Sequence, residues 1–293
     1  ANLPAQAVVK FFAVSQDEAG NRTTNDNGGT FFTITNAQPV PYLFLDSFAD
    51  YYLFGFLISE APPPSGYTDA LDQLGLAYET FDARSGALPS QAQLNAHRCV
   101  IWRMSDLEPP SPTLVQRLTS YVTNGGSLFV ASMEGTSRLT EAGLGRFVTD
   151  ILHVQSFTVD QVVDEIAGMP GEPVGTGIHT MLDYAPYDSI LALAGTADPS
   201  DWILPDTNAA PAIVSGNAIV GLRAPKTGVD LPGRVVFFAF PLDAVPLGSG
   251  IGNNRAGLLR SALNFLAAPA NTSRVSLDSD VYSVPGRATV EVE

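Results

Sequence analysis

The chain has 293 residues, 45% of them hydrophobic, which is enough for a large buried core. Its formal net charge of -15 argues against a nucleic-acid or anionic-membrane surface built from basic side chains. A single cysteine excludes an internal disulfide framework, and no apolar run reaches the roughly 18 residues that predict a membrane span. The acidic composition, poor in lysine and rich in Ser, Thr, Gly and Pro, favours an extracellular or cell-surface protein.

The N-terminal stretch is rich in β-forming residues. Two such runs, Val8 to Ser15 and Thr30 to Thr35, flank a polar segment of Asp, Asn and Gly that is typical of a turn. This pattern predicts a β-hairpin.

The next part of the chain alternates strand and helix signals. The run "PYLFLD" is continuously apolar, as in strands buried on both faces of a parallel sheet. We expect a helix near 68–74, ended by Gly75, and another that begins at Pro112 and ends at Gly125. Strands are predicted at 41–46, 77–81, 98–104 and 127–132.

The pattern continues with a helix near 138–152, an irregular stretch to about 206, a hairpin at 212–214 and 218–222, a strand at 234–240 and a helix at 254–266. Alternation of this kind predicts an α/β fold with a doubly wound, mostly parallel sheet.

The C-terminal stretch has two further β-runs, Arg274 to Leu277 and Ala288 to Val292, around a Pro285-Gly286 turn. An isolated two-stranded hairpin is marginally stable in water, so each end of the chain needs more strands. They can come from a neighbouring module, from another copy of the chain, or from the other end of the same chain.

Two segments of the middle resemble class I glutamine amidotransferase-like domains, a flavodoxin-like class that includes the ThuA-like proteins. The segment "ASMEG" is similar to the family's nucleophile elbow, and "FFAFPLD" is similar to its segment with the catalytic histidine. The resemblance places Met133 where the family has its nucleophilic cysteine and Phe240 where it has the base. A thioether cannot form a thiolate and a phenyl ring cannot accept a proton, so we expect thiol-based amidotransfer to be absent.

The flanks resemble bacterial immunoglobulin-like or fibronectin type III-like modules, on the strength of "VVKFFAVSQDEAGNRTTN" and "VSLDSDVYSVPGRATVEVE". The expected organisation is the last strands of one such module at 1–38, the amidotransferase-like domain at 39–269, and the opening strands of another at 270–293.

Polar side chains follow the predicted parallel strands, where open α/β sheets bind ligands. They are Asp46, Ser47, Asp106, Glu134 and Asp243, and His179 is a further candidate from the irregular stretch. Several carboxylates in one crevice would bind a cation such as Ca²⁺ or hydrogen-bond a sugar. The same acids also serve as caps of helix N-termini and loops. We expect no other cofactor.

Two sequons, at Asn21 and Asn271, are candidates for glycosylation.

Three functions are compatible with these features. The first is a non-catalytic structural, adhesive or assembly unit of a secreted multidomain surface protein. Such a unit would pair its strands with neighbouring β-modules or with copies of itself, and pairing between copies would make it a filament subunit. The second is a hydrolytic or carbohydrate-active accessory domain with an acidic crevice, which would need two carboxylates that flank the substrate. The third is a ligand sensor on an inactive amidotransferase fold.

Overall fold

The computed structural model describes residues 7–11, 13–17, 19–25, 29–30, 32–36, 41–184, 199–227, 233–267, 275–277 and 290–292. Contacts between Cα atoms divide the chain into two compact units. One unit combines Ala1–Pro39 with Pro269–Glu293, and the other is Val40–Ala268. Both ends of the chain therefore belong to the same unit.

The terminal unit consists of paired strands. Antiparallel pairing joins β1 (Ala7–Phe11) to β4 (Phe32–Asn36) and β2 (Ala13–Gln16) to β3 (Arg22–Asn25), as expected for the predicted N-terminal hairpin. The C-terminal strands β18 (Val275–Leu277) and β19 (Val290–Val292) also pair antiparallel. The Pro285-Gly286 turn lies outside the described residues. The immunoglobulin-like character of these strands stays a prediction.

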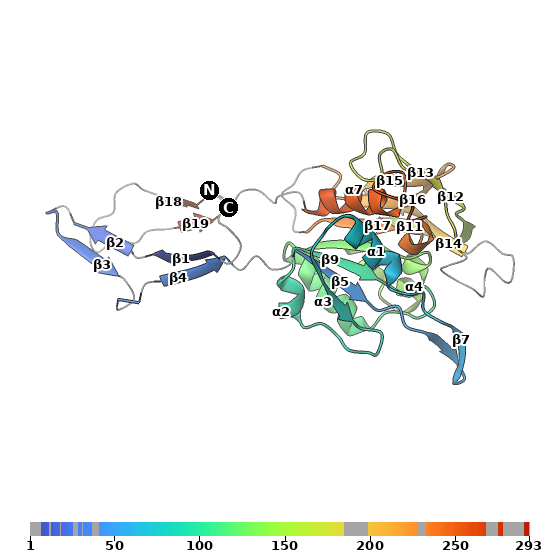
Figure 1. Ribbon diagram of the computed structural model, residues 1–293, viewed down its shortest axis with the longest axis horizontal. Helices are drawn as coiled ribbons and strands as arrows, with labels where there is room; N and C mark the ends of the chain where they lie inside the picture. The colour runs from blue at the N-terminus through green and yellow to red at the C-terminus, as the bar shows by residue number, and fades with distance from the viewer. Residues whose placement is uncertain are drawn as a thin grey trace. The chain divides into compact units, whose positions relative to one another are not determined.

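The large unit is built on a nine-stranded sheet (Figure 1). Five of its strands are parallel and lie in the order β8-β5-β9-β10-β17. In chain order this is 2-1-3-4-5, the flavodoxin-like arrangement, so the predicted fold class is confirmed. The bounds are β5 Tyr42–Asp46, β8 Tyr78–Asp82, β9 Cys99–Arg103, β10 Ser127–Ala131 and β17 Val235–Phe238.

Four antiparallel strands extend the sheet beyond β17. In order from β17 outwards they are β16 (Ala218–Ala224), β15 (Ala210–Ser215), β12 (Glu165–Gly168) and β13 (His179–Met181). The hairpin predicted at 212–222 is the β15–β16 pair.

Helices cover both faces of the sheet, because four of the parallel strands, β5, β9, β10 and β17, are buried on both sides. Phe44 points to the face that α1 (Ser65–Gln73) and α7 (Arg255–Ala267) cover, whereas Leu43 and Leu45 point to the opposite face. That opposite face packs against α2 (Gln91–Asn95), α3 (Pro112–Thr123), α4 (Gly135–Glu141) and α5 (Gly145–Asp150). A 3-10 turn, η1 (Leu242–Ala244), follows β17.

Three segments differ from the sequence-based expectation. The helix expected over 138–152 is two helices, because Gly143 adopts a φ of +76° between α4 and α5. The stretch expected to be irregular contains β11 (Val154–Val162), paired antiparallel with β14 (Pro199–Pro205). A hairpin of β6 (Tyr51–Leu53) and β7 (Phe56–Ser59) lies in a segment for which no strand or helix was predicted.

No helix within the described ranges is both long enough and apolar enough to cross a membrane.

Candidate functional site

The carboxyl ends of the parallel strands meet at one edge of the sheet, which we call the carboxyl edge. Asp46 ends β5 and Arg103 ends the neighbouring β9. In the 2-1-3-4-5 order, the chain leaves β5 toward one side of the sheet to form β8 and then continues on the other side with β9. The gap between β5 and β9 is called the switch point, and folds of this kind bind ligands outside it. The carboxyl edge is therefore the place to examine for chemistry.

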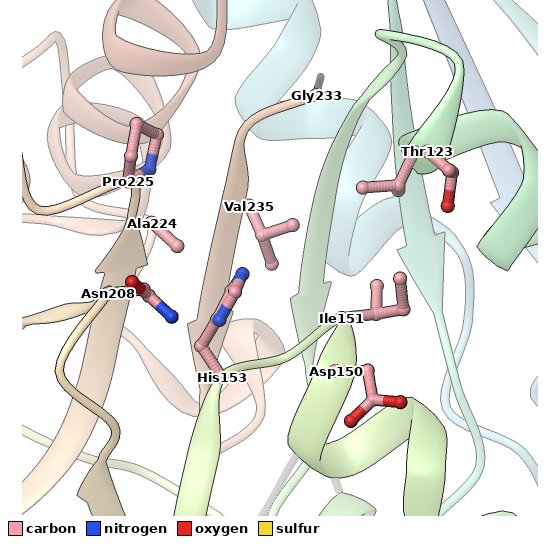
Figure 2. A pocket seen from close by; sticks show the side chains of 10 residues that line it. Thr123, Asp150, Ile151, His153, Asn208, Ala224, Pro225, Gly233 and Val235 are labelled. Carbon is pink, nitrogen blue, oxygen red and sulfur yellow. The ribbon is translucent and has the colours of Figure 1, made fainter. Parts of the chain in front are cut away.

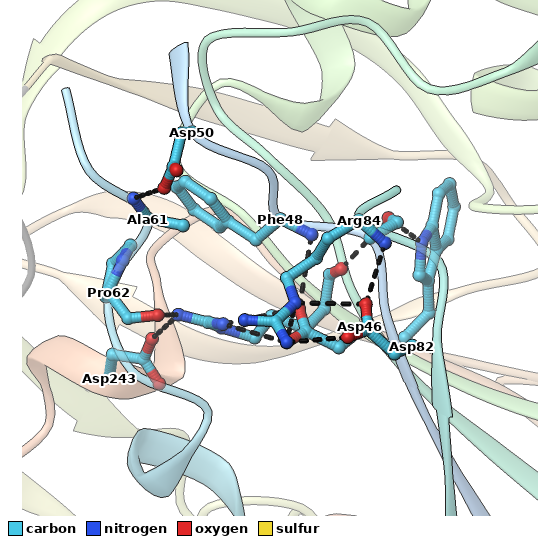
Figure 3. A network of polar contacts seen from close by, with 11 residues as sticks. Asp46, Phe48, Asp50, Ala61, Pro62, Asp82, Arg84 and Asp243 are labelled. Carbon is cyan, nitrogen blue, oxygen red and sulfur yellow. Dashed lines mark hydrogen bonds and ion pairs between the residues drawn. The ribbon is translucent and has the colours of Figure 1, made fainter. Parts of the chain in front are cut away.

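A buried arginine occupies the middle of this edge. Arg103 is 1% exposed, and its Nη1 donates to both oxygens of Asp46 at 3.3 Å. Its Nη2 donates to Asp243 Oδ2 at 3.1 Å and to the Pro62 carbonyl at 2.6 Å. Figure 3 shows these contacts, with Asp46 on one side and Pro62 and Asp243 on the other. Two of the acids predicted to bind a cation thus already hold one that the chain itself supplies.

Aromatic rings close this arrangement. The Arg103 guanidinium lies 5.0 Å from the centroid of the Phe48 ring and 5.9 Å from that of Tyr67. Burial raises the pKa of the Asp243 carboxyl, and the charges of Arg103 and Arg255 oppose this rise. Asp46 and Asp243 are buried and each pairs with Arg103, so both carboxylates act as partners of a cation that the chain supplies.

The elbow segment, Ala131 to Gly135, lies beside this arginine and is filled. Met133 is buried against Phe48, and Phe240 is buried in a stack on Phe238 with 5.1 Å between ring centroids. The two positions that the resemblance assigned to nucleophile and base are therefore apolar packing positions. The one cysteine, Cys99, is also buried, and burial raises the pKa of its thiol.

Asp106 and Ser132 form a buried polar pair next to the elbow. The Ser132 hydroxyl donates to Asp106 Oδ1, and the Glu134 backbone N–H donates to the same oxygen at 3.3 Å. Burial raises the pKa of Asp106 to about 7, although these hydrogen bonds lower it. Both side chains are fully buried, so Ser132 does not reach a substrate from the solvent.

The remaining predicted site residues have separate positions. Ser47 accepts a hydrogen bond from the indole of Trp102 at 2.8 Å, and Glu134 pairs with Arg138 at 2.9 Å. His179 lies on β13, the edge strand at the far end of the sheet, where it is exposed and pairs with Glu165. The structure therefore does not bring His179 to the carboxyl edge.

Sequence reasoning missed Asp201, which β14 brings to the elbow. Its Oδ2 accepts a hydrogen bond from the Thr136 hydroxyl and one of 2.9 Å from the Ser137 backbone N–H. Its own N–H donates to the Met133 carbonyl at 2.7 Å. Asp201 was missed because the stretch around it was expected to be irregular.

A crevice opens outside the switch point, beside the filled elbow. Its volume is about 250 Å³, and it lies over the ends of β5, β8 and β9 and over the start of α3. Its polar lining consists of Ser47, Asp50, Arg84, Ser105, Glu108 and Ser111. This mixture of hydroxyls, two carboxylates and one guanidinium suits a small polar ligand.

No group of three or more His, Cys, Asp and Glu side chains that could hold a metal ion occurs in the part of the chain that the structure describes. Of the two sequons, Asn21 is exposed and its side chain donates to Asp17 at 2.8 Å, whereas Asn271 lies outside the described residues.

No protein-family model matches the sequence, and no curated protein matches it. Among solved structures, the chain is similar to a cytoplasmic protein of Salmonella typhimurium, with 13% identity, a TM-score of 0.50 and coverage of 77% of this chain and 98% of that one. A second cytoplasmic protein, from strain LT2 of the same species, gives 12% identity, the same two coverages and a TM-score of 0.47. A protein of Bacteroides uniformis described as ThuA-like gives 10% identity, coverage of 80% and 94%, and a TM-score of 0.43.

These comparisons correct one expectation. Composition favoured an extracellular location, but the first of these similar structures is described as a cytoplasmic protein, which contradicts that expectation. Acidity and a low lysine content describe the surface of a protein and carry no targeting signal. By its sheet order and its likeness to the first of these structures, the chain has a flavodoxin-like α/β fold.

Proposed function

We propose that this protein is a non-catalytic assembly module built on an amidotransferase-like scaffold. The observation that carries the proposal is the filling of the elbow by the chain's own apolar side chains. Met133 packs against Phe48, and Arg103 is held between Asp46 and Asp243. Among the described residues, the two positions that the resemblance assigns to the nucleophile and the base hold Met133 and Phe240, whose side chains can act as neither.

The assembly role is supported by surfaces without an internal partner. The β6–β7 hairpin exposes five large apolar side chains, which is more than monomeric proteins ordinarily leave in water at one place. In the terminal unit, the described strands form two-stranded pairs, whose outer edges are able to accept further strands. We propose that these strands belong to a β-sandwich of the immunoglobulin or fibronectin type III kind.

Two measurements on the full chain test the proposal. Glutamine hydrolysis, followed as glutamate release, should stay at the level of buffer. Light scattering after gel filtration should show a mass that increases with protein concentration. Glutamine hydrolysis that disappears on changing Ser132 to Ala would contradict the non-catalytic part, and a mass of one chain at every concentration would contradict the assembly part.

The crevice at the switch point supports a second function, which is binding of a small polyhydroxylated ligand such as a sugar. Asp50 and Glu108 offer acceptors for hydroxyl groups and Arg84 offers donors. Calorimetric titration with a panel of monosaccharides tests it. Binding should be lost in Arg84→Ala and kept in Arg138→Ala, whose guanidinium is engaged at the elbow. A panel without heat changes would remove this function.

A further inference from the structure

The hairpin formed by β6 and β7, which we call the apolar hairpin (residues 51–59), emerges from the carboxyl edge after β5 and projects from the α/β body (Figure 1). It contains no charged residue, although the chain carries a net charge of -15. Phe54 at its tip is 91% exposed and Phe56 is 73% exposed. Tyr52, Leu57 and Ile58 are exposed beside them.

The tip residue is unfavourable in the free chain for two independent reasons. Phe54 and Gly55 form the two-residue turn with φ values of +50° and +82°. Positive φ at both positions is the geometry that Asn-Gly or Asp-Gly normally provides, and a bulky residue rarely adopts it. The same phenyl ring also stands almost entirely in water, where its apolar surface gains nothing from burial. Both costs are explained if the ring has a partner.

The opposite edge of the sheet offers a pocket of matching size. About 260 Å³ in volume, it lies beside the start of β17 and the end of α3 (Figure 2). Its floor and walls are apolar, with Val122, Ile151, Ala224 and Val235. Thr123 and His153 stand among the polar groups that line it. A dry cavity of about 150 Å³ holds one benzene molecule, so this pocket has room for a phenyl ring.

We propose that copies of this chain associate head to tail, with Phe54 of one copy seated in this pocket of the next. The inference rests on the proposed assembly function and specifies its contact. Because hairpin and pocket lie at opposite edges of one sheet, a single copy can donate its tip and receive another tip. Two different surfaces meet in such a heterologous contact, which extends into a chain of copies unless the rotation closes a ring.

A second copy fits the hairpin better than a lipid bilayer does. Asp50 and Glu60 border the hairpin on both sides, and the acidic chain is repelled by anionic headgroups. The uncharged hairpin in turn allows two acidic copies to approach. A contact of one tip and its neighbours is small, so association should require high protein concentration.

Complementary variants of the full chain test the contact. Phe54→Asn removes the tip and provides the preferred Asn-Gly turn, so the hairpin stays folded. Thr123→Trp fills the pocket from an exposed position, and Asn208→Trp does so from a second exposed position. Sedimentation velocity over roughly 5–500 μM should show concentration-dependent association in the wild type and monomers in each variant.

The decisive sample is an equimolar mixture of Phe54→Asn and Thr123→Trp. The first variant has an open pocket and no tip, and the second has a tip and a closed pocket. The mixture should therefore form dimers that stop at two copies. The control Ile251→Asn, exposed and outside both surfaces, should associate like the wild type.

Each other outcome overturns the inference in a distinguishable way. If Phe54→Asn and the two tryptophan variants all associate like the wild type, this contact is rejected and the assembly function is retained. Loss in Phe54→Asn alone, with full association in both tryptophan variants, shows that the tip binds elsewhere. A wild type that is monomeric at all concentrations rejects the assembly function itself, and its co-sedimentation with phosphatidylcholine vesicles would then assign the hairpin to a bilayer.

Discussion

The two edges of the parallel sheet, the carboxyl edge and the amino edge at the opposite ends of the strands, differ in what fills them. At the carboxyl edge, the elbow and the position of Asp46 are closed by a buried arginine with two carboxylates and two aromatic rings. At the amino edge, the pocket beside Val235 is open and mostly apolar. At the carboxyl edge the elbow is core and the crevice of about 250 Å³ beside it is lined by several polar side chains, whereas the pocket at the amino edge, of about 260 Å³, has a mostly apolar lining. A shared architecture therefore does not fix the location or the chemistry of a site.

The largest effect should come from removal of the cation that closes the carboxyl edge. Arg103→Met leaves Asp46 and Asp243 buried without their partner, and we expect a loss of about 3–5 kcal/mol in the free energy of unfolding. Urea denaturation measures it. Arg84→Met, which removes a 40% exposed arginine 3.6 Å from the same Asp46, should cost no more than about 1 kcal/mol. Equal losses in the two variants would show that burial of the charges is not what distinguishes this edge.

The second effect is a dependence of stability on pH that originates beside the elbow. The pKa of Asp106 is raised from 3.8 to about 7, so the folded chain keeps a proton that the unfolded chain releases between these pH values. The free energy of unfolding should therefore fall as the pH rises through this interval, by up to about 4 kcal/mol for this group.

Asp106→Asn retains an acceptor for Ser132 and removes the titration. The difference in unfolding free energy between this variant and the wild type should grow in favour of the variant from pH 4 to pH 7.5. Asp201 and Asp243, whose pKa values burial also raises, leave a residual slope in both proteins. Parallel pH profiles of the two proteins would refute the assignment to Asp106.

The third effect concerns the amino edge. Gly233 has a φ of +57°, and a Cβ there would lie 2.4 Å from the carbonyl oxygens of Val122 and Gly126. Gly233→Ala should destabilise the unit by about 1–3 kcal/mol and distort the pocket. Thermal unfolding measures the first consequence. Gly86→Ala, at a positive φ with open space around it, is the matched control and should show the backbone strain alone. If both variants lose the same free energy of unfolding, the close approach of the Cβ to the two carbonyl oxygens at Gly233 does not contribute to the loss.

The smallest effect is expected from placing a thiol at the elbow. Met133→Cys places a thiol in the apolar cluster with Phe48, where burial keeps it protonated. We expect no glutaminase activity, slow alkylation by iodoacetamide in the folded state, and a loss of about 1 kcal/mol from the removed atoms. Rapid alkylation would indicate that the elbow opens to solvent and that the two edges differ less than proposed.

Much of the fold follows from the sequence because its signals are local. Continuous apolar runs identified most of the parallel strands, and the helix predicted to begin at Pro112 and to end at Gly125 is α3, Pro112–Thr123. The hairpin at 51–59 was missed because its apolar residues face solvent, whereas an apolar run ordinarily indicates a buried strand. Strand β11 was missed because most of its side chains are exposed and show no inward alternation.

The location of the candidate site at the carboxyl edge was predictable from the sequence, but the pairing of its carboxylates with a buried arginine was not. Asp46 and Asp243 were expected at the carboxyl edge, where the structure places them. Their neutralisation by Arg103 was not foreseen, since this residue falls inside an apolar strand pattern. A single arginine inside an apolar strand run indicates buried carboxylates nearby, because a buried guanidinium needs acidic partners.

The capping of α4 by Asp201 has a kinetic consequence. No side chain near the start of this helix caps it, and the carboxylate that accepts the Ser137 N–H comes from a residue 64 positions later. A loop of that length must close before the first turn gains its cap, so this turn should form late on the folding pathway. Interactions made after the transition state govern the rate of unfolding and have little effect on the rate of folding. We therefore expect the rate of unfolding to depend on the contact between β14 and the start of α4.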